Sequence, residues 1–313
     1  MNKFILVSTI LCLVALIESK REVKFAPYIY LEHGIDFVKL KNDAHLTGIS
    51  LAFALGGSNC VPHWDAGSID DKDLVKQFHA FKQAGGQIIV SSGGADGKYI
   101  ENSCGGDSNR LAAAYKRVIE VTGAVGLDLD FEETVNLDMV MAAVKIVQQQ
   151  TGVTVSLTLG ADENGLGGTQ MNVVRAAIKH GVDVDIVNPM AMDYNKSSKY
   201  RTWGDSVIGC VEAVHRQMKQ ELWPGKSDAE LYSRLGVTPM IGENDCCNAK
   251  FTTDHARQLL QWAKQKGLGH IGFWSVNRDH QCHGSESQTN APSDKCSGVP
   301  QQNYEFSHIF DML

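Results

Sequence analysis

The sequence alternates short apolar runs with amphipathic segments along almost its whole length. Eight runs have the composition of strands, and they cover residues 24–30, 46–55, 86–94, 124–132, 153–160, 184–194, 235–242 and 270–276. One helical pattern between them follows Asn136, a good N-cap residue, and another ends before Gly267. This alternation predicts an α/β fold, a (β/α)8 TIM barrel in a single domain. An open doubly wound sheet is the alternative, but no G-x-G-x-x-G follows the first run.

The first residues have the character of a secretory signal peptide. Lys3 precedes an apolar run that ends near Ile17 and is too short to span a bilayer comfortably. We expect residues 1–19 to be removed, residues 20–313 to form the barrel, and the mature protein to be secreted and extracellular. An uncleaved anchor is the alternative, because the cleavage region lacks a clean small-x-small pattern.

Composition narrows the range of partners. The chain has 313 residues, 43% of them hydrophobic, and a net charge of −7 with scattered rather than clustered Lys and Arg. A basic surface for nucleic acid is therefore not predicted. We expect no nucleic-acid partner, no membrane association after signal cleavage, and a monomer.

Cysteine usage agrees with an exported protein. Cys12 would leave with the signal peptide, and the odd number that remains leaves at least one cysteine unpaired. Cys282 and Cys296 flank a polar loop that a disulfide would stabilise by roughly 3 kcal/mol, so we expect this pair. Cys60 and Cys104 are further disulfide candidates. The pairing of the remaining cysteines stays open: Cys210, Cys246 and Cys247.

A metal site is an alternative reading of the segment around Cys282. Asp279, His280 and His283 are potential ligands beside it. Their spacing matches no recognised zinc motif, so we expect no metal and no cofactor.

The stretch Gly123 to Glu133, GAVGLDLDFEE, carries carboxylates at alternate positions of an apolar run. On a strand, Asp128, Asp130 and Glu132 share one face, which in a barrel is the interior. Three like charges in a low-dielectric interior cannot all ionise cheaply, so at least one should hold a proton near neutral pH. Such a carboxylic acid can act as a general acid. Solvent-facing acidic residues are the structural alternative, but the flanking residues are apolar.

Four segments of the chain together resemble glycoside hydrolase family 18, the chitinases and their relatives. GLDLDFE is similar to the D-G-x-D-x-D-x-E signature of that family, and SSGG at 91–94 is similar to its S-x-G-G motif. MAMDY at 190–194 resembles its strand-six motif, and GFWSVNRD at 272–279 resembles its strand-eight segment. The resemblance covers essentially the whole mature chain and favours a bacterial-type enzyme without the chitinase insertion domain.

The resemblance implies roles for particular residues. Glu132 would be the proton donor, Asp130 would orient the substrate's acetamido group, and Asp128 would share a proton with Asp130. Tyr194 would be the fourth catalytic residue and would steady the acetamido group together with Asp193. The implied substrate-binding residues are Trp274, as the floor of the sugar site, with Asp193, Met192, Tyr28, Gly93 and Gly94.

The sequence departs from the family pattern at two places. Val125 replaces the first Asp of the signature, which we expect to shift pKa values rather than abolish activity. In the strand-six motif Met192 precedes Asp193 and Tyr194 follows, so the register of the tyrosine is open, and a core tyrosine is the alternative.

The implied activity is that of a secreted chitinase, with chitin or chito-oligosaccharides as substrate and a substrate-assisted, retaining mechanism. The segment between 242 and 270 is too short for an inserted domain, so the groove should be open and cleavage internal. A catalytically inactive chitinase-like lectin or inhibitor is one alternative. An endo-β-N-acetylglucosaminidase acting on glycoprotein glycans is the other.

Overall fold

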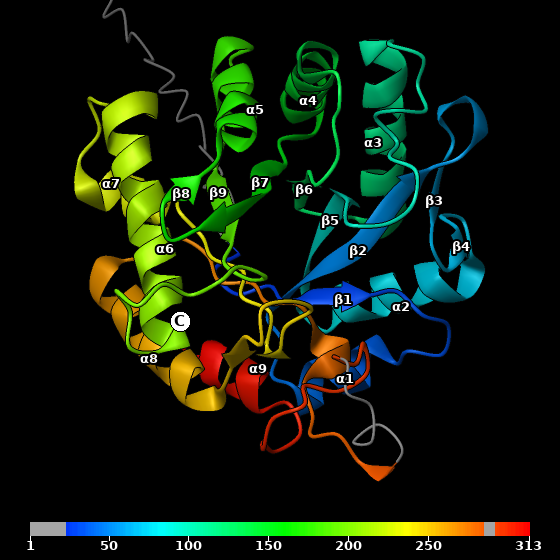
Figure 1. Cartoon of the computed structure of the whole chain (residues 1–313). Coiled ribbons are helices and arrows are strands. Elements are labelled where there is room, and N and C mark those ends of the chain that lie inside the picture. The colour runs from blue at the N-terminus through cyan, green and yellow to red at the C-terminus, as the bar shows by residue number, and fades with distance from the viewer. Residues whose placement is uncertain (1–22, 285–291) are drawn as a thin grey trace, which may run out of the picture.

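The computed structural model describes residues 23–284 and 292–313, and the expected signal peptide lies outside them. Six parallel strands form the continuous part of a barrel wall, in the spatial order β1, β2, β5, β6, β7, β9 (Figure 1). Their bounds are β1 Tyr28–Tyr30, β2 Gly48–Gly56, β5 Gln87–Gly93, β6 Gly126–Asp130, β7 Thr154–Asp162 and β9 Ile186–Met190.

The two remaining apolar runs close the barrel through short bridges. Parallel bridges join Met190 to Thr238, Met240 to Trp274 and Phe25 to Ile271. The ring of parallel pairings is therefore complete, and the predicted TIM barrel is confirmed. The runs 235–242 and 270–276 are not the continuous strands that the sequence predicted. Pro239 contributes to this difference, because it has no amide hydrogen to donate to a ladder.

Helices surround the strands, as the alternation predicted (Figure 1). Their apolar faces pack on the outside of the barrel in one continuous core. The bounds are α1 Phe37–Asp43, α2 Lys72–Gln83, α3 Ser108–Thr122, α4 Leu137–Thr151, α5 Gly168–Lys179, α6 Trp203–Gln217, α7 Asp228–Ser233, α8 Thr253–Lys266 and α9 Glu305–Phe310. Small antiparallel additions are β3 Pro62–Trp64, β4 Gly67–Ser68, β8 Gly165–Leu166, β10 Gly242–Glu243 and β11 Lys250–Phe251.

Local sequence signals set the ends of the helices. The side chain of Asn136 accepts a hydrogen bond from the Met139 amide at 3.2 Å and so caps α4, as predicted. Helix α8 ends at Gly267, whose φ of +70° is the left-handed conformation that glycine adopts without strain. In the residues that the structure describes, no helix is both long and apolar enough to cross a bilayer.

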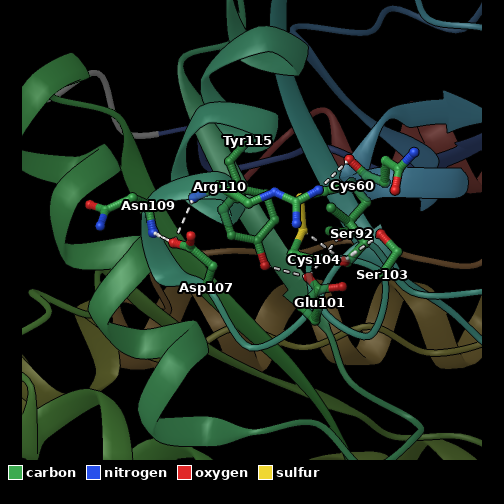
Figure 2. Close-up of a disulfide and its surroundings, with 11 residues drawn as sticks. Cys60, Ser92, Glu101, Ser103, Cys104, Asp107, Asn109, Arg110 and Tyr115 are labelled. Carbon is green, nitrogen blue, oxygen red and sulfur yellow. Dashed lines mark hydrogen bonds between the residues drawn. A yellow bond between two sulfur atoms is a disulfide. The ribbon is translucent and has the colours of Figure 1, made fainter.

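The disulfides follow the sequence-based expectation and add one pair. Cys60 is joined to Cys104 and Cys282 to Cys296 (Figure 2 shows the first). The neighbours Cys246 and Cys247 form a third disulfide in the loop between β10 and β11, which the sequence left open. Cys210 is buried in α6 without a disulfide partner.

The alternative of a metal site around Cys282 does not hold. The sulfur of Cys282 is bonded to Cys296. The Asp279 carboxylate is buried and accepts hydrogen bonds from the amide and the hydroxyl of Ser307, at 2.8 and 2.7 Å.

The Cys60–Cys104 disulfide should contribute strongly to stability. It closes a segment with a sequence separation of 44 residues, so its removal restores much conformational freedom to the unfolded chain. We expect Cys60→Ala/Cys104→Ala to lower the free energy of unfolding by about 2 to 5 kcal/mol, measured by urea denaturation. The matched control is Cys282→Ala/Cys296→Ala, whose sequence separation is 14 residues and whose loss should cost less. Equal stability of the first variant and the unmodified protein would contradict the prediction.

Candidate active site

The register of β6 decides which groups surround each carboxylate in the barrel. Asp128 pairs with Ser91 of β5 on one side and with Ser156 of β7 on the other. One level higher, Asp130 pairs with Gly93 and with Thr158. Asp128 therefore has hydroxyl groups on both sides, whereas Asp130 faces a residue without a side chain.

Asp128 is fully hydrogen-bonded. The hydroxyls of Tyr28 and Ser91 donate to its Oδ2 at 2.8 and 2.7 Å. Those of Ser156 and Thr158 donate to Oδ1 at 2.6 and 2.8 Å. Four hydroxyl donors compensate a carboxylate for the water that it loses on burial. The shared proton with Asp130 that the family resemblance implied stays a prediction.

Asp130 has the opposite surroundings. Its side chain is 3% exposed, and its Oδ1 has no hydrogen-bond partner among the described residues. Burial raises the pKa of Asp130 well above its ordinary value, and the charges of Asp128 and Glu132 raise it further. Among the three carboxyl groups, Asp130 therefore has surroundings that favour the protonated form.

Glu132 lies just beyond the end of β6, at the mouth of the barrel. Glu132 is exposed to solvent, but the wall of the pocket removes part of the hydration of its carboxyl group. This desolvation raises the pKa of Glu132, and the charges of Asp193 and Asp96 add to the rise. These surroundings favour the acid form of a glutamic acid that can still reach a ligand.

A pocket of about 200 Å³ opens at the carboxyl ends of the strands and contains Asp130 and Glu132. Its aromatic floor consists of Trp274 and Phe53, whose rings stack 5.8 Å apart at 11°, with Tyr28 6.2 Å from each. Three methionines and several acidic residues form the walls: Met190, Met192, Met240, Asp96, Asp193, Asp245 and Asp294. Apolar rings beside acidic groups suit a sugar, which has apolar faces and polar edges.

A larger hollow of about 360 Å³ lies at the opposite end of the barrel, around Val23 and His270. None of the three signature carboxylates lines it. The position of Asp130 and Glu132, rather than the size of the cavity, identifies the candidate active site.

Most of the predicted site residues meet in this pocket. Tyr28, Asp130, Glu132, Met192 and Asp193 line it, together with Trp274. Asp128 lies beneath it and reaches it through Tyr28.

Gly93 and Gly94, predicted as substrate-binding residues, do not line this pocket. Both are buried behind the pocket wall, and the Gly94 amide donates to the Asp130 carbonyl at 2.9 Å. A Cβ atom at Gly93 would lie 1.9 Å from the same carbonyl oxygen, and its φ of +119° disfavours any other residue. These glycines allow β5 and β6 to approach closely, and they help to position the backbone of Asp130.

Tyr194 is likewise not brought into the pocket. Its hydroxyl lies 3.2 Å from the hydroxyl of Ser206 on α6, and its ring packs 5.1 Å from that of Trp203. The chain turns at Asp193, which has a φ of +55°, and the side chain of Tyr194 therefore points to the helix layer. The alternative of a core tyrosine describes its position better than the predicted catalytic role.

The loop that holds Asp193 could not be predicted from the sequence. The amide of Cys246 donates to Asp193 Oδ1 at 3.1 Å, and Asn244 Oδ1 accepts from the Asp193 amide at 3.4 Å. The hydroxyl residues around Asp128 did leave a signal, because Ser156 and Thr158 interrupt an apolar strand at alternate positions.

Comparison with known proteins gives a relative of similar length. The catalytic domain of a hyperthermophilic chitinase from Pyrococcus furiosus is 34% identical, with a TM-score of 0.83, and the match covers 92% of this chain and 94% of that one. The chain belongs to glycoside hydrolase family 18, the chitinases. Catalytic-site mutants of the same Pyrococcus domain have been solved in complex with chito-oligosaccharides.

Two curated members of the family are longer than this chain. A probable bifunctional chitinase/lysozyme of Escherichia coli (strain K12) is 30% identical over 277 residues, which are 82% of this chain and 31% of that protein. Endochitinase 11 of Metarhizium anisopliae is 29% identical over 274 residues, 82% of this chain and 52% of that protein. The matched part of the chain thus spans 31% of the first relative and 52% of the second. No family model matches it.

Asp130→Asn should change how the stability of the protein depends on pH. At a pH between the ordinary pKa of aspartic acid and the raised pKa in the folded chain, Asp130 holds a proton in the folded chain but has lost it in the unfolded chain. The folded state then binds more protons, so its stability falls as the pH rises through the interval between the two pKa values. Asparagine does not titrate, and the variant should lack this fall and be more stable by about 1 to 3 kcal/mol at pH 8.

Thermal unfolding at several pH values checks this. Asp128→Asn is the matched control with the opposite sign, because it removes a carboxylate that accepts four hydrogen bonds and should lower the midpoint at pH 8. Parallel pH profiles for Asp130→Asn and the unmodified protein would contradict the prediction.

Proposed function

We propose that the protein is a secreted chitinase that cleaves β-1,4 linkages between N-acetylglucosamine units, with the substrate's own acetamido group as the nucleophile. One observation carries the proposal: a protonatable Glu132 at the mouth of a sugar-sized pocket lies two residues after a buried carboxyl group with a free oxygen. The complex of the Pyrococcus furiosus relative with chito-oligosaccharides supports the substrate class.

Glu132 supplies the proton in the first step. Its raised pKa keeps the acid form available, and its carboxyl group donates the proton to the glycosidic oxygen as the bond from that oxygen to the anomeric carbon breaks. The oxygen of the acetamido group forms a new bond to the same carbon from the opposite face, which gives an oxazolinium ion. The carboxylate of Glu132 then accepts a proton from water, and the water oxygen opens the ring with net retention.

Asp130 suits the orientation of the acetamido group. Its unpartnered Oδ1 is an acceptor beside the pocket, and the acetamido N–H is a donor that a bound substrate would bring. Positive charge on the oxazolinium ion favours the ionised form of Asp130, although burial favours the neutral form in the free protein. The acetamido N–H of a bound substrate would therefore supply the missing hydrogen bond to Asp130, and the positive charge of the oxazolinium ion would stabilise its ionised form.

The walls of the pocket support an open binding groove. A single short hairpin, β10 with β11, stands between the Met240 bridge and α8. This leaves no inserted domain along that side of the groove. We infer internal cleavage of a chain, since an open groove accepts a polymer at any point along its length.

Glu132→Gln tests whether Glu132 is the proton donor. Glutamine has nearly the same shape but cannot deliver a proton, so kcat on chitotetraose should fall by about 10³-fold or more. Sugar binding should stay close to that of the unmodified protein, because the aromatic floor and Asp130 are unchanged. The measurement is steady-state turnover with resolution of the product anomers, beside calorimetric titration of the variant with chitotetraose.

Trp203→Phe is a suitable control, since Trp203 lies on α6 and outside the pocket. Near-normal turnover by Glu132→Gln would place the acid elsewhere. Sugar binding without any turnover by the unmodified protein would indicate a lectin or an inhibitor. Turnover confined to high-mannose glycans would indicate an endo-β-N-acetylglucosaminidase.

Secretion is tested separately. Three disulfides among the described residues are typical of an oxidising compartment. We expect the exported protein to begin near residue 20 and to carry the Cys282–Cys296 disulfide, as checked by intact-mass and peptide analysis under non-reducing conditions. Retention of residues 1–19 in the mature protein would favour a membrane anchor.

A further inference from the structure

The backbone that carries Glu132 is held by a residue outside the predicted site. Strand β6 ends at Asp130, and the amides of Glu132 and Glu133 lie beyond the ladder. Both donate to the hydroxyl oxygen of Tyr99, at 2.9 and 3.2 Å. Tyr99 belongs to the segment between β5 and α3 and is 1% exposed.

The hydroxyl group of Tyr99 is used to its full capacity. A phenol has one hydrogen to donate and two lone pairs to accept. The two amides occupy the lone pairs, and the hydrogen is donated to the Gly94 carbonyl at 2.7 Å, with the Asp130 carbonyl at 3.2 Å. One oxygen atom thus joins the turn after β5 to the residues after β6.

The ring and the surrounding segment fix that oxygen in place. The ring of Tyr99 stacks on Phe131, with centroids 6.2 Å apart at 27°. The segment is anchored at Glu101, which accepts from Ser92 at 2.9 Å and from Tyr115, and at the disulfide of Cys104 (Figure 2). Burial raises the pKa of Tyr99, so the phenol keeps its proton over the pH range in which a carboxylic acid operates.

The carboxyl group of Glu132 has no comparable support. Within residues 23–284 and 292–313, no side chain donates a hydrogen bond to it. Its place in the pocket therefore follows from the course of its own backbone. An error of about 1 Å in the place of a catalytic group can reduce the rate by about 100-fold.

We infer that Tyr99 is the positioning residue for the acid: its hydroxyl fixes the main chain at Glu132 and so aims the carboxyl group into the pocket. The inference rests on the proposed function, because it assigns the role to a proton donor. Tyr99 itself does not touch the substrate.

Tyr99→Phe removes the hydroxyl and keeps the ring that stacks on Phe131. We expect kcat on chitotetraose to fall by about 10- to 100-fold, because Glu132 is misplaced, while KM changes by less than about twofold. Thr122→Val is the matched control: it removes a buried hydroxyl of nearly the same environment, but that hydroxyl donates to the Val118 carbonyl within α3, at 2.8 Å, and not to the backbone of Glu132 or the segment that carries Tyr99. Its kcat should stay within about twofold of that of the unmodified protein.

The comparison distinguishes the possible failures. Near-normal kcat for Tyr99→Phe, or an equal loss in both variants, would overturn the inference and leave the proposed function intact. Absence of turnover by the unmodified protein would overturn both. A loss of kcat in Tyr99→Phe alone, with thermal midpoints of the two variants lowered alike, would support positioning over a general loss of stability.

A second variant covers the case in which Tyr99→Phe does not fold. Replacing the main-chain amide of Glu132 by an ester keeps every side chain and removes the N–H that donates to the Tyr99 hydroxyl at 2.9 Å. We expect kcat on chitotetraose to fall by about 10-fold or more, while KM changes by less than about twofold. A kcat equal to that of the unmodified protein would overturn the inference.

Discussion

The unequal surroundings of two neighbouring carboxyl groups underlie the whole site. Asp128 and Asp130 lie on the same face of β6, two residues apart, and both are buried. The first accepts four hydroxyl hydrogen bonds, and the second has an oxygen with no partner among the described residues. Because a buried charge needs compensation, the barrel supplies hydrogen-bond donors to the first carboxyl group and favours the neutral form of the second.

The difference arises from the neighbours that the barrel register supplies. The strands beside β6 present serine on both sides at the level of Asp128, but Gly93 and Thr158 at the level of Asp130. The Thr158 hydroxyl donates to Asp128. A side chain at Gly93 would collide with the Asp130 carbonyl, so the same glycine permits close packing and withholds a donor. Gly93 therefore affects both the spacing of β5 and β6 and the hydrogen bonding of Asp130 at the carboxyl end of β6.

Sequence reasoning succeeded where the relevant pattern was local. The alternation of Asp128, Asp130 and Glu132 on one face follows from the geometry of any strand, and the helix caps at Asn136 and Gly267 follow from their own neighbours. It failed at Tyr194, whose direction depends on a left-handed turn at Asp193. It also missed Tyr99, because the contact with the Glu132 amide joins positions 33 residues apart through the path of a loop. Such paths are decided by packing and leave no periodic trace in the sequence.

The described residues contain seven cysteines, and an odd number usually brings a risk of disulfide exchange that this fold avoids. Among the residues that the structure describes, Cys210 is the one cysteine outside a disulfide, and it is completely enclosed by the packing of α6. Burial raises the pKa of its thiol, and only the thiolate attacks disulfides. The folded molecule can therefore carry three disulfides and a thiol together without exchange between them. Covalent cross-linking between molecules would require α6 to detach first.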